Sequence, residues 1–180
     1  IQSLLHHNNY QNFEIIIAEN NSTEPETFEY YEKIKKVDNR INIVYWKKEF
    51  NYSAINNFAA EFAAGELLLF LNNDTEIIHD DTLDWMVGYA SMDHCGCVGA
   101  KLLYPDHKVQ HAGVVLGFGG VAGHIYVANS YDDNGMFGRL AMPYNYTAVT
   151  AACLMIQKSR FEEAGGFDEN LKVALNDVDL

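Results

Sequence analysis

Two polar clusters, each placed directly after a short apolar run, hold the residue types best suited to chemistry. Residues 19–23 read Glu-Asn-Asn-Ser-Thr and offer a carboxylate, two amides and hydroxyls, which could bind a nucleobase and its ribose. Residues 72–76 read Asn-Asn-Asp-Thr-Glu and offer two carboxylates among other oxygen-bearing side chains. Hard divalent cations such as Mg²⁺ or Mn²⁺ take oxygen ligands and are held by one or two carboxylates together with phosphates. Each cluster alone is equally consistent with a polar turn that ends a strand, but the pair favours a nucleotide site.

A third acidic group lies near the C-terminal end of the sequence. Residues 165–169 read Gly-Gly-Phe-Asp-Glu, and residues 176–179 read Asn-Asp-Val-Asp. A carboxylate at the start of a helix tends to stay ionised because the helix dipole favours an anion. An ionised aspartate in a cleft is a candidate general base, and the alternative for the same residues is a helix N-cap without chemistry.

The elements that must position these clusters alternate between strands and helices. Apolar runs predict strands over 14–18 and 67–71, and strand-like alternation predicts one over 41–46. Helical periodicity predicts helices over 25–37 and 52–64. This alternation is typical of a parallel sheet covered by helices. Since ligands bind at the carboxyl ends of the strands in such sheets, we expect both polar clusters at the same edge.

The second half of the sequence is less regular. We expect a helix over 81–91, a strand over 98–103, a glycine-rich turning segment over 113–123 and a strand over 148–157. A capping box at 159–162 then predicts a helix that ends at Gly165-Gly166. Nothing marks a linker, so the sequence predicts one α/β domain.

Composition excludes several classes of partner. The chain has 12 Lys plus Arg against 25 Asp plus Glu, which gives a net charge of −13 and argues against a nucleic acid or an anionic membrane face as the main partner. A small anionic ligand remains compatible, since a divalent cation can bridge acid to phosphate. At 48% hydrophobic residues the chain can bury a sizeable core.

Cysteine usage, hydropathy and sequons bear on the compartment. The three cysteines are predicted to be free thiols, and the apolar runs are far shorter than the ~20 residues of a membrane-spanning helix. Glycans on the sequons would block the predicted ligand-binding segments, so we expect a cytoplasmic protein. These sequons begin at Asn20, Asn21, Asn51, Asn73 and Asn145.

Taken in order, the motifs resemble those of glycosyltransferase family 2, whose members are inverting enzymes with the GT-A fold. Residues 18–24 sit where the family has its V-D-D/N-G-S-T-D motif, and residues 71–74 resemble its L-D-x-D signature. Asn57 lies eight residues before Gly65. The same spacing separates the Asn from the last Gly in the family's A-R-N-x-G-x-x-x-A-x-G-E segment. The C-terminal acidic group resembles G-G-F-D-E followed by E-D-x-D-L. Residues 111–113 and 150–153 are similar to rhamnosyltransferase-like members that build bacterial surface polysaccharides.

The resemblance implies a role for each candidate site residue. Asp74 would bind Mg²⁺ or Mn²⁺ at the donor diphosphate, and Asp177 would be the catalytic base. Two positions depart from the family pattern, because Glu19 stands in place of an Asp and Asn72 replaces the first Asp of the metal signature. The residues expected to bind the donor nucleotide are Glu19, Asn20, Ser22, Asn57, Asn72 and Asn73.

The architecture implied by the resemblance is a Rossmann-like α/β fold of GT-A type, with a mostly parallel central sheet and helices on both faces. The family's first strand does not precede Ile1, so we expect a single catalytic domain, 1–180, truncated at both ends. Residues 1–110 would form the nucleotide-sugar-binding half, and residues 111–180 the acceptor and catalytic-base half.

The implied function is inverting transfer of a sugar from a nucleoside-diphosphate sugar to a saccharide or lipid-linked saccharide acceptor. Such an enzyme would serve cell-surface polysaccharide or lipopolysaccharide synthesis, with peripheral association at the inner face of the cell membrane through parts outside this chain. The alternative is a non-catalytic nucleotide-sugar or carbohydrate-binding module, which Asn72 and the truncated ends favour and which Asp74 and Asp177 oppose. A nucleotidyltransferase would instead need a basic phosphate-gripping loop after the family's first strand, which lies outside this sequence.

Overall fold

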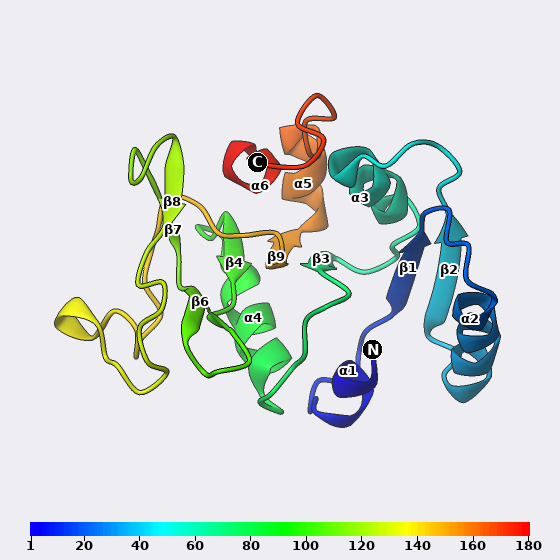
Figure 1. Cartoon of the computed structure of the whole chain (residues 1–180), viewed down its shortest axis with the longest axis horizontal. Coiled ribbons are helices and arrows are strands. Elements are labelled where there is room, and N and C mark those ends of the chain that lie inside the picture. The colour runs from blue at the N-terminus through cyan, green and yellow to red at the C-terminus, as the bar shows by residue number, and fades with distance from the viewer. The chain divides into compact units, whose positions relative to one another are not determined.

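The computed structural model describes residues 1–180 and has a mixed α/β architecture (Figure 1). Its contacts divide the chain into two compact units, each built from two stretches of sequence. Unit 1 comprises Ile1–Asn9 and Leu69–Gln157, and unit 2 comprises Tyr10–Leu68 and Lys158–Leu180. This partition differs from the predicted functional division near residue 110, which stays a prediction.

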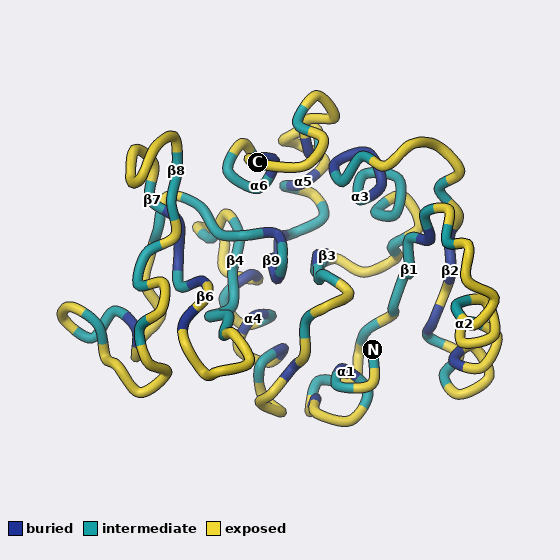
Figure 2. Tube along the Cα trace, in the orientation of Figure 1, coloured by how far each residue is buried: buried dark blue, intermediate teal, exposed yellow.

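Unit 2 is built on a parallel pair of strands, β1 (Ile15–Glu19) and β2 (Ile41–Tyr45), joined by helix α2 (Pro25–Val37). The register pairs Ile15 with Ile41 and continues to Glu19 opposite Tyr45, so both strands end together. Proline fits the first turn of α2 because its missing N–H needs no partner there. Most of α2 is exposed (Figure 2).

The rest of unit 2 consists of helices α3 (Tyr52–Ala60), α5 (Lys158–Ala164) and α6 (Asn176–Asp179). Phe167, in the loop between α5 and α6, is 2% exposed and forms the centre of this region. Its ring packs edge-on against Tyr52 of α3 and Phe161 of α5, with centroids 6.0 Å and 5.4 Å away. Burial of such aromatic rings joins the C-terminal segment to α3.

Unit 1 is centred on strand β9 (Cys153–Gln157), which lies between β3 (Leu67–Leu71) and β4 (Cys97–Gly99) in a three-stranded sheet. Residues 153–156 of β9 are all buried, and α4 (Thr82–Ala90) buries Leu83, Met86 and Ala90 at helical spacing. The remaining elements of unit 1 are short: α1 (Gln2–His6), β5 (Leu102–Leu103), β6 (Val109–His111), β7 (Val114–Leu116), β8 (Ala122–His124) and the single turn η1 (Met136–Gly138).

The predicted elements of the first half are confirmed with small changes at their ends. The helix predicted over 52–64 ends at Ala60. Beyond this point each backbone N–H of residues 61–63 donates to the carbonyl three residues earlier, as in a 3₁₀ turn, and Glu14 Oε1 accepts the N–H of Ala64 at 2.6 Å. The helix predicted over 81–91 is α4, and the helix predicted to end at the glycine pair is α5. Helix α1 was not predicted.

The strands of the second half differ more from the expectation. The run at 98–103 forms two strands, since the chain leaves β9 after Gly99 and pairs with β6 from Leu102 onward. The segment predicted to turn at 113–123 is the β7–β8 hairpin. The parallel arrangement is confirmed for β1 and β2, whereas the β4–β9, β5–β6 and β7–β8 pairs are antiparallel and the strands form four separate sheets. The β5–β6 and β7–β8 pairs are consecutive strands joined by short connections, and parallel pairing would need a long crossover.

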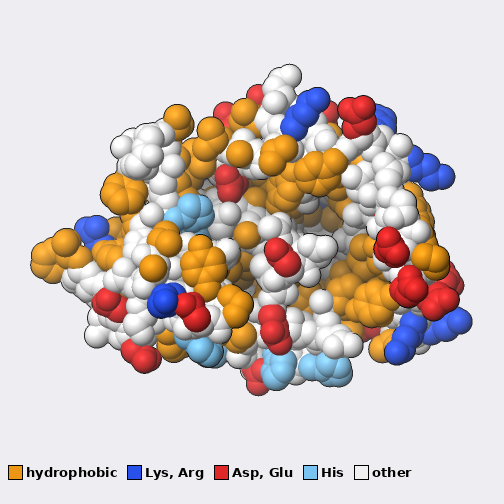
Figure 3. Space-filling view, in the orientation of Figure 1, with side chains coloured by type: hydrophobic (Ala, Val, Ile, Leu, Met, Phe, Trp, Pro, Cys, Tyr) orange, Lys and Arg blue, Asp and Glu red, His pale blue; other side chains and the backbone are white.

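The three cysteines are free, as predicted. Charged side chains are scattered among exposed hydrophobic side chains over the face drawn in Figure 3. Phe137 of η1 is 86% exposed. None of the helices is both long and apolar enough to cross a bilayer.

Candidate functional site

The Glu19 carboxylate is buried at the carboxyl end of β1 and is 4% exposed. Its Oε1 accepts the backbone N–H of Ser22 at 2.6 Å, and its Oε2 accepts the hydroxyls of Ser22 and Tyr31, both at 2.8 Å. Burial alone would raise the pKa of this carboxyl, but the three donors outweigh burial and hold the pKa below its ordinary value. The site therefore keeps a buried, ionised carboxylate that shapes the loop after β1.

Tyr31 projects from α2 onto the Glu19 carboxylate. Burial, together with the hydrogen bond to Glu19, raises the pKa of the Tyr31 hydroxyl to about 12. The hydroxyl therefore keeps its proton at neutral pH and serves as a donor to the carboxylate. Tyr31 lies within the segment predicted as a helix over 25–37, and its role at Glu19 was not predicted.

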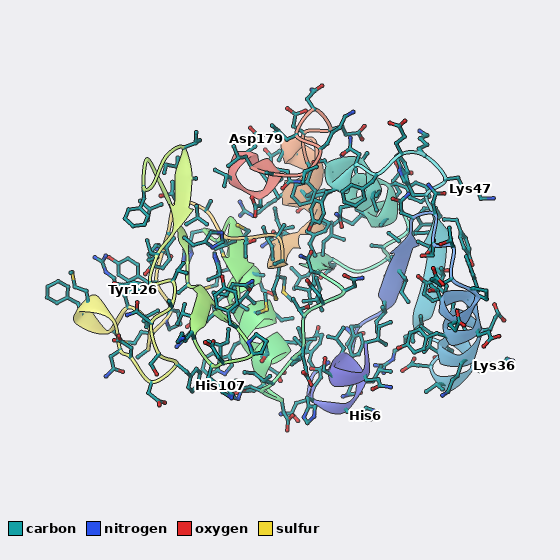
Figure 4. The ribbon with its side chains drawn as sticks, in the orientation of Figure 1. His6, Lys36, Lys47, His107, Tyr126 and Asp179 are labelled. Atoms are coloured by element: carbon teal, nitrogen blue, oxygen red, sulfur yellow. The ribbon has the colours of Figure 1, made fainter.

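The amides that follow Glu19 bind the loop after β2. Asn20 Nδ2 donates to the carbonyls of Trp46 and Lys48, each at 3.0 Å, and Asn21 Nδ2 donates to Lys48 at 2.8 Å. Lys47, in the same loop, projects outward from the strand pair (Figure 4). Asn21 has φ 55°, a left-handed conformation that asparagine tolerates better than most residues. The ends of the two parallel strands are thereby fixed to each other.

The second polar cluster forms a tight turn at the end of β3 in unit 1. Thr75 donates both its N–H and its hydroxyl to the carbonyl of Asn72, at 3.3 Å and 2.6 Å. The N–H of Asn72 donates to the carbonyl of Ala152 at 3.0 Å, which attaches the turn to the segment before β9. Asn73 and Asp74 are exposed in this turn.

The turn offers oxygen ligands of the kind that Mg²⁺ and Mn²⁺ prefer, with Asp74 as a carboxylate and Asn72 and Asn73 as amides. No group of three or more His, Cys, Asp or Glu side chains is arranged to hold a metal ion. One carboxylate nevertheless suits an open site, because Mg²⁺ is commonly bound by one or two carboxylates plus substrate phosphates. The residues present therefore fit a divalent cation whose other ligands come from a donor diphosphate and water.

Asn57 lies on α3 and spans the backbone of Phe167. Its Oδ1 accepts the N–H of Phe167 at 2.9 Å, and its Nδ2 donates to the carbonyl of the same residue at 2.9 Å. Nδ2 also donates to Glu169 Oε1 at 3.3 Å. Both ends of this amide are thus engaged within the chain.

Asp177 lies half-buried on α6, the short helix that also carries Asp179 (Figure 4). Its N–H donates to Asn176 Oδ1 at 3.0 Å. Burial and the nearby charge of Asp177 raise the pKa of the Tyr52 hydroxyl to about 12. Tyr52 therefore stays protonated beside this carboxylate, an arrangement that no sequence motif had indicated.

The predicted site residues fall into three groups. Glu19, Asn20 and Ser22 form one hydrogen-bonded loop at the end of β1 and β2. Asn57 and Asp177 belong to the assembly of α3 with the C-terminal segment, and the turn at 72–74 is part of unit 1. The roles given to these residues remain predictions.

Comparison with known proteins gives the family. Residues 1–163 match the profile described as Glycosyl transferase family 2. The chain belongs to this family. Two curated relatives are each 45% identical to this glycosyltransferase chain over its whole length: the "O-antigen biosynthesis protein RfbC" of Myxococcus xanthus and the "Uncharacterized protein y4gI" of Sinorhizobium fredii (strain NBRC 101917 / NGR234).

The chain spans 14% of the length of the Myxococcus protein and 20% of the Sinorhizobium protein. The family profile ends before Gly165, so the segment with Asp177 lies beyond it, whereas both relatives align through that segment. The predicted membership of glycosyltransferase family 2 is confirmed.

Proposed function

We propose that this domain catalyses inverting transfer of a sugar from a nucleoside-diphosphate sugar to an acceptor hydroxyl. Its membership of glycosyltransferase family 2 carries the proposal. The relative named for O-antigen biosynthesis supports a saccharide or lipid-linked saccharide as the acceptor and cell-surface polysaccharide or lipopolysaccharide as the product. The GT-A arrangement, with a nucleotide-sugar-binding half over 1–110 and an acceptor half over 111–180, is part of the same proposal, as is a cytoplasmic location at the inner face of the cell membrane.

In this proposal the loop at the carboxyl end of β1 binds the donor nucleotide. Glu19, Asn20 and Ser22 shape the pocket for the base and ribose, and their hydrogen bonds hold the loop in one conformation before the donor arrives. Asn72 and Asn73 contribute further polar groups from the turn after β3. The full engagement of Asn57 with Phe167 favours an indirect role for that residue.

Asp74 is proposed to hold Mg²⁺ or Mn²⁺ at the donor diphosphate. When bound, such a cation supplies Lewis-acid stabilisation of the charge that develops on the departing diphosphate. Asp74 contributes an exposed carboxylate, and the turn around it is fixed by the bonds from Thr75 to the carbonyl of Asn72.

Asp177 is proposed to remove the proton of the acceptor hydroxyl as that oxygen attacks the anomeric carbon. Attack from the face opposite the diphosphate inverts the configuration of that carbon. The half-buried position of Asp177 supports this role, because a general base acts from a site that shields it partly from water.

The decisive experiment is sugar transfer by the full-length protein carrying Asp177→Asn. A missing general base costs about 10²–10⁴-fold in rate, while binding of the donor nucleotide should be unchanged. Asp179→Asn is the matched control, because Asp179 is an exposed carboxylate on the same short helix. Normal transfer by the Asp177→Asn protein would contradict the assignment of the base.

A non-catalytic nucleotide-sugar-binding module is the second candidate. It is favoured by Asn72 in place of an acid. That module would bind the nucleotide with equal affinity in the original protein and the Asp177→Asn protein, and neither would transfer sugar.

A further inference from the structure

The first turns of α3 hold the segment that leads to Asp177. The Ser53 hydroxyl donates to the carbonyl of Leu171 at 2.7 Å, and the N–H of Tyr52 donates to the carbonyl of Lys172 at 2.8 Å. Asn51, the N-cap of α3, donates its Nδ2 to the carbonyl of Glu169 at 2.9 Å. Three consecutive residues at the start of α3 thus bind one loop.

Asn57, one turn further along α3, also forms hydrogen bonds with this segment. Its two bonds to Phe167, both 2.9 Å, use the carbonyl oxygen and one N–H of the amide, and the bond to Glu169 uses the other N–H. A carboxamide has only two N–H donors, so neither remains for a nucleotide. Direct donation from Asn57 to the donor substrate would first require breaking one of these bonds.

The hydrogen bonds with α3 reach Asn176, the residue before Asp177. Asn176 is 4% exposed, and its Nδ2 donates to the Ser53 hydroxyl at 3.4 Å. Leu175, just before it, has φ 65°, a left-handed conformation that costs a residue with a branched side chain about 1–2 kcal/mol. Such a conformation persists only where surrounding contacts impose it, and the buried Asn176 on Ser53 provides them.

We propose that Asn57 and Ser53 are positioning residues for Asp177 and not ligands of the donor nucleotide. They hold residues 166–176 against α3, and this loop sets where Asp177 stands. The inference rests on the proposed function of Asp177 as the base. In this proposal Asn57 acts on the position of Asp177 through the loop, whereas the family resemblance implied that Asn57 contacts the nucleotide.

The test compares Asn57→Ala with Asn56→Ala in the full-length protein. Asn56 is the same residue type one position earlier, but its Nδ2 donates to the carbonyl of Tyr52 at 2.8 Å within its own helix. We expect Asn57→Ala to lower kcat at saturating donor by about 10-fold or more, because small misplacements of a catalytic group cost up to ~10²-fold. The Kd for the nucleoside diphosphate should change by less than about twofold, and Asn56→Ala should leave both quantities near those of the original protein.

Ser53→Ala should follow the same pattern as Asn57→Ala, with a loss in kcat and no loss of nucleotide affinity. Hydrogen–deuterium exchange of peptides covering 166–176 should become faster in both variants but not in Asn56→Ala. Faster exchange reports release of the loop independently of activity. Weaker nucleotide binding with normal kcat in the Asn57→Ala protein would overturn the proposal and make Asn57 a nucleotide ligand.

Failure of the underlying function gives a different result. If Asp177→Asn transfers sugar normally, the proposed base is wrong, whatever the Asn57 variants do. If Asp177→Asn is inactive while Asn57→Ala and Asn56→Ala have equal kcat values, the base stands and the positioning role is refuted.

Discussion

A Cβ added at Gly166 would lie 2.6 Å from Oδ1 of Asn57, the atom that accepts the N–H of Phe167. No carbon atom can stand so close to that oxygen, so one of the two must move. Gly166 also has φ 75°, which glycine adopts without strain. The glycine thus permits the close approach of α3 to the loop that carries Phe167.

Gly166→Ala is therefore expected to break the hydrogen bonds between Asn57 and Phe167. Gly165→Ala is a matched control, since Gly165 has φ 87° and open space around its added Cβ. Both variants incur the left-handed penalty of about 1–2 kcal/mol, and Gly166→Ala adds the collision. Hydrogen–deuterium exchange of peptides covering 166–172 should rise more in Gly166→Ala than in Gly165→Ala. Equal exchange in the two variants would show that the contact with Asn57 does not hold the loop.

Tyr31→Phe should destabilise the loop after β1, because it removes one of the three donors to the buried Glu19 carboxylate. A hydrogen bond to a charged group contributes about 1.5–3 kcal/mol. Tyr30→Phe is the control, since Tyr30 is the neighbouring tyrosine on α2 and is 38% exposed. The measurement is the free energy of local opening from hydrogen exchange at about neutral pH, and equal values for the two variants would contradict the role of Tyr31.

The cost of Tyr31→Phe should also depend on pH. The pKa of Glu19 in the folded chain lies below its ordinary value of 4.5, so its ionised form contributes stability that is fully present above that value. This contribution is lost as the pH falls through the folded pKa. The difference in the free energy of local opening between the Tyr31→Phe protein and the original protein should therefore become smaller in acid and stay constant above about pH 6.

The strands that position the site could be predicted because their signal is local. The run of apolar residues at 67–71 coincides with β3, and the proline before a periodic segment marks the start of α2. The polar cluster after β1 could likewise be located, since it follows directly from the end of an apolar strand. Both features depend on residues adjacent in the sequence.

The partners of the site residues could not be predicted, because they come from distant segments. Tyr31 reaches Glu19 across 12 residues, and Asn57 meets Phe167 across 110 residues. Ser53 gives no sequence signal for binding Leu171, 118 residues away, because a serine near a helix start is read as a capping residue. Tertiary packing alone decides these contacts.

Asp74→Ala is expected to weaken metal-dependent binding of the donor nucleotide. Asp74 supplies the carboxylate of residues 72–74 in the turn after β3. Without it, the neutral amides of Asn72 and Asn73 cannot balance the charge of a divalent cation. Glu76→Ala is the control, because Glu76 is an exposed acid two residues further on. Calorimetric titration of UDP, dTDP and GDP into the full-length protein, with Mn²⁺ and then with EDTA, measures the effect. Unchanged affinity with Mn²⁺ in the Asp74→Ala protein would exclude Asp74 as a metal ligand.

Unit 1 should lose stability between about pH 6.5 and pH 4 because of His111. This side chain is 1% exposed, its Nε2 accepts the N–H of Thr150 at 3.5 Å, and its Nδ1 lies 2.8 Å from Nδ1 of His124. With Nε2 as the acceptor, Nδ1 carries the proton and donates to His124. Burial and the nearby His124 lower the pKa of His111 from 6.5 to about 4.

The direction follows from proton uptake. Below about pH 6.5 the unfolded chain protonates this histidine, whereas the folded chain keeps it neutral until the pH reaches about 4, so acid favours unfolding. A shift of this size corresponds to about 3 kcal/mol over the whole interval. The urea midpoint of unit 1, followed through labelling of the buried Cys153 by a dipyridyl disulfide, should fall between about pH 7 and about pH 5. His111→Gln should flatten this dependence and His94→Gln, which alters an exposed histidine, should retain it; a slope that survives in His111→Gln would assign the acid sensitivity to another group.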